Sequence, residues 1–572
     1  MTLTKSKTQS IYHPSKEDTW TGVNWSKVET SVEKLQHRIT RAAEKGQYRK
    51  VRNLQRLITK NSLSAQLKAV RIVSQENSGK LTPGIDGQLW TTPQTKHQAA
   101  SELRKKLTSK PLKRVYIPSA NGSQRRETLG IPCMSDRAHQ ALWNLALLPT
   151  VEATSDPHSY GFRPYRGCWD VNAQIRTLLD KPNRPQWVLD ADIEKCFDKI
   201  NHDWLLKHTP METKVLKGWL KAGYFENNNP ELFLTEEGTP QGGVISPTLA
   251  NFTLNGLEQH LQTLDKPKRV LCLTSKNYKR LSTCVNVVRY ANDFIVTGRS
   301  KRQLELVKES INEFLAPRGL RISETKTSIR PIFEGFDFLG WTFRKYSNGK
   351  LLCRISMKSI IKHRKEIKYL TKTIHQPELL IYKLNSKIRE WMIYHHCCNN
   401  IWEVWGSMNN YLYERLMKWG QRRHGNKTKK WIFNKYWKHV NGRWTFTGTT
   451  NNNSTYILRS YDLRQKRIRT RISSTVNVFD LKNKTKIRQV QLEKSNDLPS
   501  KKARVWKKQH GICPGCNQTM DPIQSNILDL HHVIPRKDGK LDKLSNLILM
   551  HEHCHYETHT NFLSIPTKSY KT

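Results

Sequence analysis

The first part of the chain has apolar residues at helical spacing. Between about positions 28 and 73, apolar side chains recur every three or four residues among Lys, Arg and Gln, a period typical of an amphipathic helix. These apolar positions are Val28, Leu35, Ile39, Leu54, Leu57 and Ile58. The pattern predicts a basic helical region, and we assign residues 1–95 to an N-terminal extension of this kind.

Short, continuous apolar runs further along the chain predict buried β-strands. One run at 187–189 leads into Asp190 and Asp192, and another at 285–289 leads into the YAND sequence that ends at Asp293. A third apolar run, FIV, follows directly, as expected for a strand. Two acidic sites therefore lie far apart in sequence but each at the end or start of a strand.

Turn residues mark further boundaries. Residues 112–132 contain two β-type runs joined by Asn121-Gly122, a pair that readily adopts the positive φ of a hairpin turn. From 356 to about 437 the pattern is helical and rich in Trp, Tyr, Lys and Arg, and the turn-rich segment 448–455 suggests a domain boundary. Basic runs follow at 459–471 and 482–488, before a Cys/His-rich end.

The charge narrows the class of partner. The 572 residues contain 97 Lys and Arg against 48 Asp and Glu, a formal net charge of +49, which favours a polyanionic partner. A cationic membrane-surface protein or a ribosomal-type structural protein is the less specific alternative. We expect no membrane association, because no apolar run approaches the roughly 20 residues that span a bilayer. The start MTLTKSKTQS lacks a signal-peptide core, and the eleven cysteines suit a reducing compartment.

The two strand-borne aspartates suggest one specific chemistry. Nucleotidyl transfer needs carboxylates that hold two divalent ions about 4 Å apart, one to activate the attacking hydroxyl and one to neutralise the leaving pyrophosphate. Asp192 and Asp293 are the candidates. A single Asp at a strand end is more often a cap or a surface residue, so the order of the surrounding motifs has to decide.

That order resembles the group II intron-encoded reverse transcriptases over about residues 70–345. The motifs, in the family's order, are RVYIPSANGSQRRETLGIP, SYGFRPYRG, DADIEKCFDKINHDWL, EGTPQGGVISPTLAN, VVRYANDFIVTG, LRISETKTSI and FLGW. The resemblance implies a mixed α+β protein with right-hand reverse-transcriptase fingers and palm, an α-helical maturase thumb and a C-terminal ββα-metal HNH domain. It implies Mg²⁺ in the palm and deoxynucleotides as substrates.

The resemblance assigns roles to individual palm residues. Asp192 and Asp293 become the Mg²⁺ ligands, and Phe197 becomes the steric gate that excludes a ribose 2′ hydroxyl, so that the product is DNA. Gln241, in the PQGG loop, resembles the residue that contacts the incoming nucleotide, although the loop could instead be a simple tight turn. Lys326 resembles the lysine that helps to protonate pyrophosphate.

The fingers assignment leaves one choice open. Arg125 or Arg126 resembles the arginine that grips the triphosphate, and the sequence does not decide between these neighbours. Ser119 stands where the family commonly has a lysine, which removes one possible triphosphate contact.

Asn292 is the more serious departure from the family pattern. The family's YADD is YAND here, and a neutral amide can offer an oxygen but not the negative charge that holds a divalent ion. If Asn292 is natural, the protein could keep RNA binding and lose DNA synthesis; if it is engineered, it would be an inactivating substitution that traps a complex.

The helical region after FLGW resembles the maturase domain that forms the polymerase thumb. Its aromatic residues, Trp391, Tyr394, Trp419, Trp431 and Trp437, alternate with the cations Arg389, Arg422, Arg423 and Lys427. Such a helix surface can combine apolar packing with phosphate contacts, and the resemblance implies that it binds the intron RNA. The basic run that contains Arg464, Lys466, Arg467 and Arg469 resembles the family's DNA-binding segment, with a solvated linker as the alternative.

The C-terminal end has the spacing of a metal site. Cys513 and Cys516 form one CxxC pair, and His551 with Cys554 forms a second, HxxC pair, which together predict a closed tetrahedral Zn²⁺ site that stabilises a small domain. A purely structural zinc-binding DNA module would explain these four residues.

A purely structural zinc-binding module would not explain the neighbouring histidines and asparagine. The order of these residues resembles that in the HNH nucleases. By this resemblance His532 is the general base, and Asn546 fixes the ββα loop. His531, His555 and His559 would bind the nuclease metal, again with Mg²⁺ as the expected ion, and Asp529 would orient a histidine.

The resemblance therefore predicts five regions and several activities. Residues 1–95 form the N-terminal extension, 96–345 the fingers and palm, 346–450 the thumb, 451–500 a basic DNA-binding segment and 501–572 the HNH domain. The expected function is to bind the intron RNA, promote splicing and reverse splicing into a DNA duplex, nick the second strand and prime DNA synthesis there. The alternative is an RNA-binding maturase without polymerase activity. Either would work in a bacterial cytoplasm or nucleoid, or in an organelle matrix.

Overall fold

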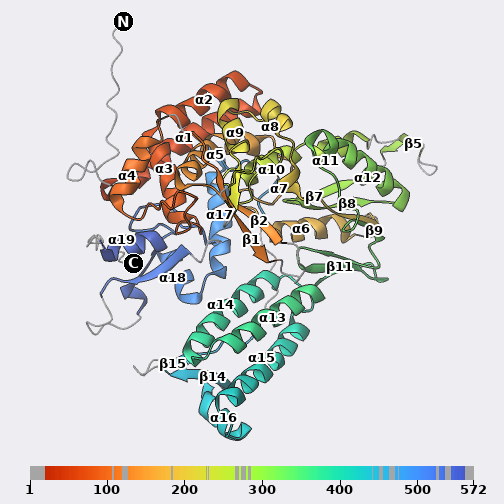
Figure 1. The fold of residues 1–572 in the computed structure, drawn as a ribbon. Helices are drawn as coiled ribbons and strands as arrows, with labels where there is room; N and C mark the ends of the chain where they lie inside the picture. The colour runs from red at the N-terminus through yellow and green to blue at the C-terminus, as the bar shows by residue number, and fades with distance from the viewer. Residues whose placement is uncertain are drawn as a thin grey trace.

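The computed structural model places the C-terminal unit beside the N-terminal helices (Figure 1). It describes residues 20–105, 108–118, 126–181, 185–226, 229, 231–264, 269–271, 278–280, 285–440, 442–449, 455–462, 471–474, 476–522, 527–534 and 543–560. Figure 1 shows N-terminal helices above, a central sheet, a helical bundle projecting below, and a C-terminal end that returns to the N-terminal helices. The α+β class expected from the sequence is confirmed.

The N-terminal unit is a bundle of helices built on the amphipathic pattern. Its elements are η1 (Trp20–Gly22), α1 (Trp25–Glu44), α2 (Tyr48–Asn61), α3 (Leu63–Arg71), the π-helical segment η2 (Ile72–Glu76) and α4 (Pro93–Glu102), packed around α5 (Met134–Ala153). The side chains of Asn24 and Ser62 cap α1 and α3 by accepting from backbone N–H groups. Val28, Ile39 and Ile58 are buried, as the spacing predicts. Leu57 is 39% exposed, because the apolar stripe of α2 turns away from it.

The predicted basic hairpin is a three-stranded sheet. β1 (Leu112–Pro118) pairs antiparallel with β2 (Arg126–Ile131), and β4 (Tyr224–Glu226) pairs parallel with the other edge of β1. Asn121-Gly122 lies outside the described residues.

The palm sheet has the strand order β7-β8-β3-β9. These strands are β7 (Asn286–Tyr290), β8 (Asp293–Gly298), β3 (Trp187–Asp192) and β9 (Ser328–Pro331), and neighbouring strands are antiparallel. Helices surround them: α6 (Cys168–Leu179), α7 (Cys196–Lys199), α8 (His202–His208), α9 (Thr213–Leu220), α10 (Ser246–Leu254), α11 (Leu257–Leu264), α12 (Lys301–Leu315) and η3 (Ala316–Arg318). A small hairpin, β5 (Arg269–Leu271) and β6 (Tyr278–Arg280), projects beyond α11.

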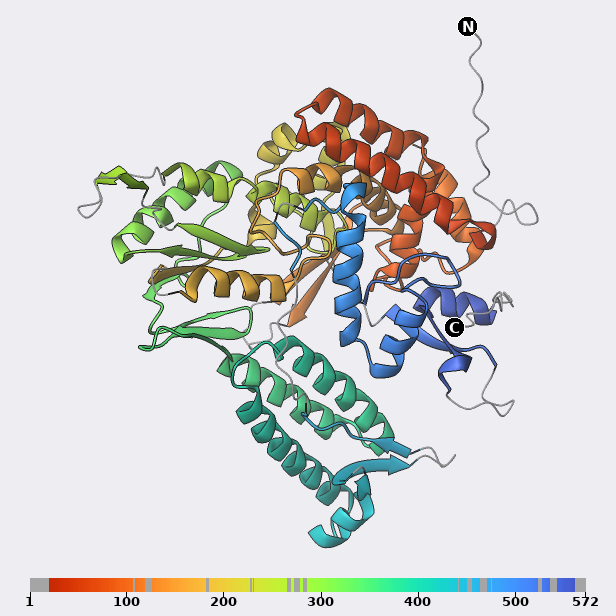
Figure 2. The same ribbon diagram turned by 180° about the vertical axis from the view of Figure 1, so that it is seen from behind.

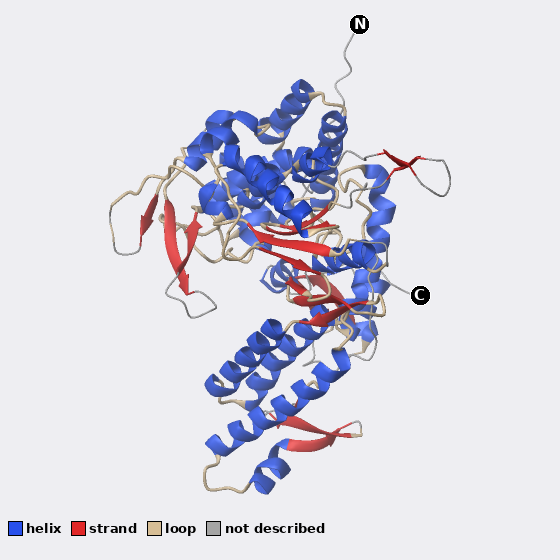
Figure 3. Cartoon of the chain, turned by 90° about the vertical axis from the view of Figure 1, so that its right-hand side faces the viewer, coloured by secondary structure: helices blue, strands red, loops and turns tan. Residues whose placement is uncertain are grey.

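The thumb is a helical bundle joined to the palm by a small sheet. β10 (Phe336–Phe338), β11 (Trp341–Lys345) and β12 (Leu351–Ile355) lead into α13 (Met357–Thr373), α14 (Pro377–His395), α15 (Ile401–Arg423) and α16 (Lys429–Tyr436). β13 (Trp437–Val440), β14 (Arg443–Thr449) and β15 (Thr455–Ile457) form a sheet beside these helices, so strands on either side of the turn-rich segment pair with each other. Figure 3 shows the bundle projecting from the rest of the molecule.

The C-terminal part crosses back from the thumb to the N-terminal helices. After η4 (Leu481–Asn483), α17 (Lys484–Lys494), η5 (Ser495–Asp497) and α18 (Ser500–Lys508), β16 (Leu528–His532), η8 (Leu544–Asn546), β17 (Leu547–His551) and α19 (Glu552–Thr560) form a ββα unit. Figure 2 shows α17 alongside the palm and this unit against the N-terminal helices. Among the described helices, none has the length and apolar character needed to span a bilayer.

Candidate active sites and metal centre

The palm sheet brings the two predicted aspartates together. Antiparallel pairing of β3 with β8 puts Asp192 directly opposite Asp293, at the end of one strand and the start of the other. Lys326, which precedes β9, forms an ion pair with the Asp192 carboxylate. Burial and, to a smaller extent, the neighbouring charge of Asp192 raise the pKa of Asp293 to about 6. Two carboxylates that repel each other in this way suit a divalent cation.

Asn292 lies at the same place and contacts the first aspartate. Its amide nitrogen Nδ2 donates a hydrogen bond to Oδ1 of Asp192 at 2.9 Å. An aspartate at position 292 would present a third carboxylate here instead of an N–H donor. The amide therefore uses one acceptor of Asp192 and adds no charge to the group.

The YAND turn packs against the SYGF motif. Ala291 has a φ of +57°, a conformation that costs a non-glycine residue energy. Arg289, which is fully buried, donates to the carbonyl of Ala291 and to the side chain of Asn251, each at 3.1 Å. Asn251 in turn donates to the carbonyl of Gly161 at 2.8 Å. Burial lowers the pKa of Arg289 to about 10.

Gly161 allows this approach because it has no Cβ. A Cβ built there would lie 2.3 Å from the backbone nitrogen of Ala291, so the turn would have to move. We expect Gly161→Ala to lower the free energy of unfolding of the palm by about 1–3 kcal/mol, as measured by urea denaturation. Gly425→Ala is the matched control, because nothing lies within 4 Å of a Cβ at that position. Equal stability of the two variants would contradict this role of Gly161.

Phe197, five residues after Asp192 in the sequence, is held against the PQGG loop. The backbone N–H of Thr239 donates to the carbonyl of Phe197 at 2.6 Å, and the ring of Phe197 packs edge-on against Phe162 with centroids 6.1 Å apart. A Cβ at Gly242 would lie 2.2 Å from the carbonyl oxygen of Gly130 in β2. The glycine therefore lets the loop backbone approach β2 of the fingers.

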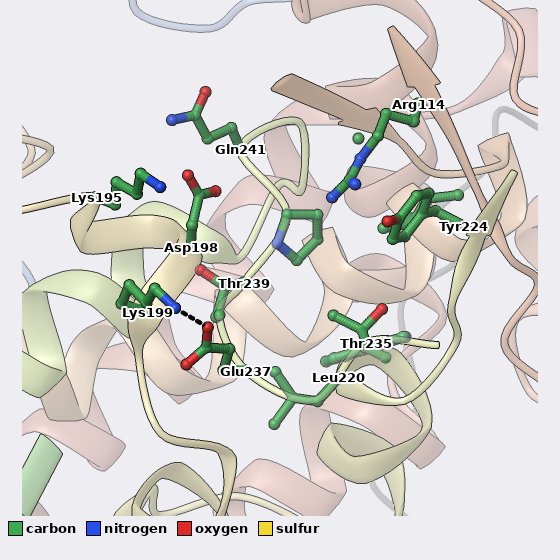
Figure 4. Close-up of a pocket in the computed structure, with 15 residues that line it drawn as sticks. Arg114, Lys195, Asp198, Lys199, Leu220, Tyr224, Thr235, Glu237, Thr239 and Gln241 are labelled. Carbon is green, nitrogen blue, oxygen red and sulfur yellow. Dashed lines mark hydrogen bonds and ion pairs between the residues drawn. The ribbon is translucent and has the colours of Figure 1, made fainter. Parts of the chain in front are cut away.

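Gln241 lines a cavity of about 320 Å³ between the fingers and the palm. Figure 4 shows its side chain around the same space as Arg114, Lys195 and Asp198. The guanidinium of Arg114 lies 3.4 Å over the ring of Tyr224, and both residues line the cavity. The PQGG loop is thus a tight turn that also presents the Gln241 side chain to this cavity.

The predicted nucleic-acid cations are only partly described. Arg125 lies outside the described residues, as do Arg464, Lys466, Arg467 and Arg469, and Arg126 is described only as the start of β2. In the thumb, Arg389, Arg422 and Arg423 each donate to a backbone carbonyl, of Asp497, Thr371 and His375 respectively. Lys427 lies 5.6 Å from the ring of Trp431. These arginines therefore join elements of the protein, which leaves only their remaining N–H groups for phosphates.

Of the five thumb aromatics, two are buried, two are half-buried and one is exposed. Trp419 and Trp437 are buried, and Trp391 stacks on His363 with centroids 4.3 Å apart. Trp431 is 37% exposed.

The four residues of the predicted zinc site meet in one buried cluster. The donor atoms of Cys513, Cys516, His551 and Cys554 all lie within 4.8 Å of one another, and Sγ of Cys516 is 3.4 Å from Nδ1 of His551. The first pair lies in the loop after α18, His551 ends β17, and Cys554 lies in the first turn of α19. Three thiol sulfurs and one imidazole are the donors of a structural Zn²⁺ site, so the residues fit such an ion.

The predicted nuclease histidines form a second cluster. His531 on β16 and His555 and His559 on α19 have donor atoms within 4.8 Å of one another, and Oδ2 of Asp529 is 3.6 Å from Nδ1 of His555. Burial and the neighbouring histidines lower the pKa of His531 to about 4, which keeps its ring in the neutral form that binds metals. Within the described part of the chain, these two clusters are the His, Cys, Asp or Glu groups of three or more that could hold an ion.

Asn546 closes the loop beside this cluster. Its side chain accepts from the backbone N–H of Ile534 and donates to the carbonyl of the same residue, each at 2.9 Å. His532 is next to His531 on β16 and is half-buried on the other face of the strand. The loop between Ile534 and Lys543 lies outside the described residues.

Several residues in these sites were not predicted from the sequence. Arg71 contacts Cys516 and His553 from the N-terminal unit, which no local spacing could indicate. Arg289 could have been noticed, because a charged residue inside an apolar strand requires buried partners. Gly161 could have been noticed only in the SYGF motif.

Four family models match the chain in the order of these units. Residues 20–103 match the N-terminal domain of reverse transcriptase, and residues 117–343 match the reverse transcriptase (RNA-dependent DNA polymerase). Residues 360–437 match the group II intron, maturase-specific domain, and residues 513–561 match the HNH endonuclease.

The curated relatives include a bacterial protein and a group II intron-encoded protein. Protein YkfC of Escherichia coli is 31% identical over 340 residues, which cover 54% of this chain and 87% of YkfC. Group II intron-encoded protein LtrA of Lactococcus lactis is 28% identical over 334 residues, covering 49% of this chain and about half, 53%, of LtrA. A telomerase structure from Candida albicans aligns with 57% of this chain and 62% of its own at 13% identity, but its TM-score of 0.29 is too low to support an argument. With the reverse-transcriptase, maturase-specific and HNH matches in this order, the chain belongs to the group II intron-encoded proteins.

Proposed function

We propose that this protein binds its intron RNA, assists its splicing and reverse splicing into DNA, and nicks the second DNA strand at the HNH site. The palm would extend the nicked end, and Asn292 limits that step. The observation that carries the proposal is the complete His531, His555 and His559 cluster, with Asn546 beside it, in a chain with a maturase-specific thumb.

RNA binding is supported by charge and by exposed aromatic side chains. The chain has a formal net charge of +49. On the thumb, Tyr382, Trp402 and Trp444 are each more than half exposed. Exposed rings beside cations can stack on bases while the cations contact phosphates. This function does not need the palm chemistry, so it holds whatever the effect of Asn292.

The nuclease step assigns one task to each residue of the ββα unit. His532 takes a proton from the attacking water, and Asn546 holds the loop that positions His532. A divalent ion bound by the three histidines would stabilise charge on the scissile phosphate. Asp529, 3.6 Å from His555, orients that ligand.

The palm step depends on Asp192, Asp293 and Lys326. The aspartates would hold Mg²⁺, which supplies charge neutralisation at the triphosphate and the primer end. Lys326, which is paired with Asp192, would donate a proton to pyrophosphate. Phe197 would exclude a 2′ hydroxyl, and Gln241 with Arg125 or Arg126 would contact the nucleotide.

A splicing assay tests the proposal. Intron precursor RNA is incubated at low Mg²⁺ with and without the protein, and with two variants that each remove two exposed cations. We expect Lys427→Gln with Lys430→Gln in the thumb to weaken RNA binding about tenfold and to flatten its salt dependence. Lys301→Gln with Arg302→Gln on α12 is the control of equal charge. If the protein does not accelerate splicing, or both variants behave alike, the proposed thumb function is wrong.

A maturase without polymerase activity is the second candidate. The hydrogen bond from Asn292 to Asp192 at 2.9 Å favours it, because the amide adds no charge to the palm. This candidate predicts accelerated splicing without primer extension and without DNA nicking.

A further inference from the structure

Arg71 is a buried cation that belongs to one domain and contacts the metal centre of another. It ends α3 in the N-terminal unit and is 2% exposed. Its Nη2 lies 3.3 Å from Sγ of Cys516 and 2.9 Å from Nε2 of His553. Its guanidinium also lies 4.4 Å over the ring of Trp25.

Further contacts join the same two units, and we call this contact surface the interdomain seam. On the N-terminal side it consists of Trp25, Arg71, Gln75 and Lys80. On the C-terminal side it consists of Cys516 and α19. Nζ of Lys80 is 2.8 Å from Oε2 of Glu552, and Gln75 donates to the carboxylate of Glu557. Trp25 packs against the apolar cores of both units. The seam is therefore built on the helix that carries Cys554.

Arg71 lies where a metal-loaded centre would carry negative charge. Three thiolates and one neutral imidazole around a divalent ion leave one net negative charge, and the guanidinium of Arg71 lies against one of those sulfurs. Glu76, whose Oε1 is 3.3 Å from Nε of Arg71, is 38% exposed and balances the cation only in part. A metal-loaded centre would therefore give this buried guanidinium a second negative neighbour, 3.3 Å from its Nη2.

We propose that the Cys513, Cys516, His551 and Cys554 centre joins the nuclease unit to the N-terminal helices through Arg71, so that metal loading and domain docking are linked. Arg71 is a positioning residue: it acts through Cys516 and holds the ββα unit in a fixed place relative to the palm. This inference needs a metal at the centre but neither polymerase nor nuclease activity, so it goes beyond the proposed function. Its failure can also be told apart from a failure in splicing or nicking.

Hydrogen exchange on the unmodified full chain tests the linkage without any substitution. The zinc-loaded protein is compared with protein treated with a zinc chelator, and backbone amides of η2 and α4 are followed beside those of α19. We expect η2 and α19 to exchange at least about tenfold faster after metal removal, whereas α2, which is away from the seam, keeps its protection. Faster exchange in α19 alone would overturn the proposal, as would no change in either element.

Metal release from variants gives a second test. Release to a chromogenic chelator is measured for Arg71→Gln, Arg71→Lys and the control Arg52→Gln, an exposed arginine of α2. We expect Arg71→Gln to release the metal at least about tenfold faster, Arg71→Lys to lie between it and the parent protein, and Arg52→Gln to match the parent. Release from Arg71→Gln at the parent rate would contradict the role of Arg71. If Arg71→Gln does not fold, the exchange experiment decides.

Discussion

Primer extension on an RNA template is expected to rise at least about a hundredfold when Asn292 is replaced by aspartate. The change removes the N–H that donates to Oδ1 of Asp192 at 2.9 Å and adds a third carboxylate to the pair formed by Asp192 and Asp293. More negative charge at this place strengthens the hold on divalent cations. The measurement is extension of a labelled DNA primer against Mg²⁺ concentration at equal RNA binding.

Two controls separate charge from packing. Asn292→Ser also removes the amide donor but adds no charge, so it should remain as inactive as the parent. Asp192→Asn in the Asn292→Asp background should abolish extension, because it returns one neutral group to the site. If the parent extends primers as well as Asn292→Asp, the asparagine is tolerated, and the proposal that it limits the palm has to be abandoned.

Replacement of His532 by alanine is expected to slow DNA nicking by about a thousandfold. The residue is the proposed general base, next to His531 on β16, and its loss leaves the three-histidine cluster and Asn546 in place. RNA binding and splicing should be unchanged, since they depend on the thumb. The assay follows conversion of a supercoiled plasmid that carries the target site to its nicked form.

His510→Asn is the matched control for this substitution. His510 is exposed in the same domain and has a φ of +51°, a conformation that asparagine tolerates. It should nick at the parent rate. Nicking by His532→Ala at the parent rate would show that another group takes the proton, and nicking lost in both variants would point to a disturbed domain.

The sequence by itself determined the elements and the identity of the sites. Continuous apolar runs predicted β3, β7 and β8, helical periods predicted α1 to α3 and the thumb, and the confirmed family follows from the order of the motifs. Spacing alone predicted that Cys513 and Cys516 would meet His551 and Cys554. These features are local or nearly so, because side-chain period and short ligand spacing depend on backbone geometry within one or two elements.

Only the tertiary structure decided those long-range contacts that no motif spacing indicates. It put the amide of Asn292 on Asp192, Gly161 under Ala291 and Arg71 on Cys516, all contacts between segments far apart in the chain. It also set the contacts of the thumb residues: Trp419 is buried, and the exposed Arg422 donates to the carbonyl of Thr371 in a neighbouring helix. The physical reason is that burial and hydrogen bonding depend on which faces the packed elements present to one another, and a linear pattern of residue types does not specify those faces.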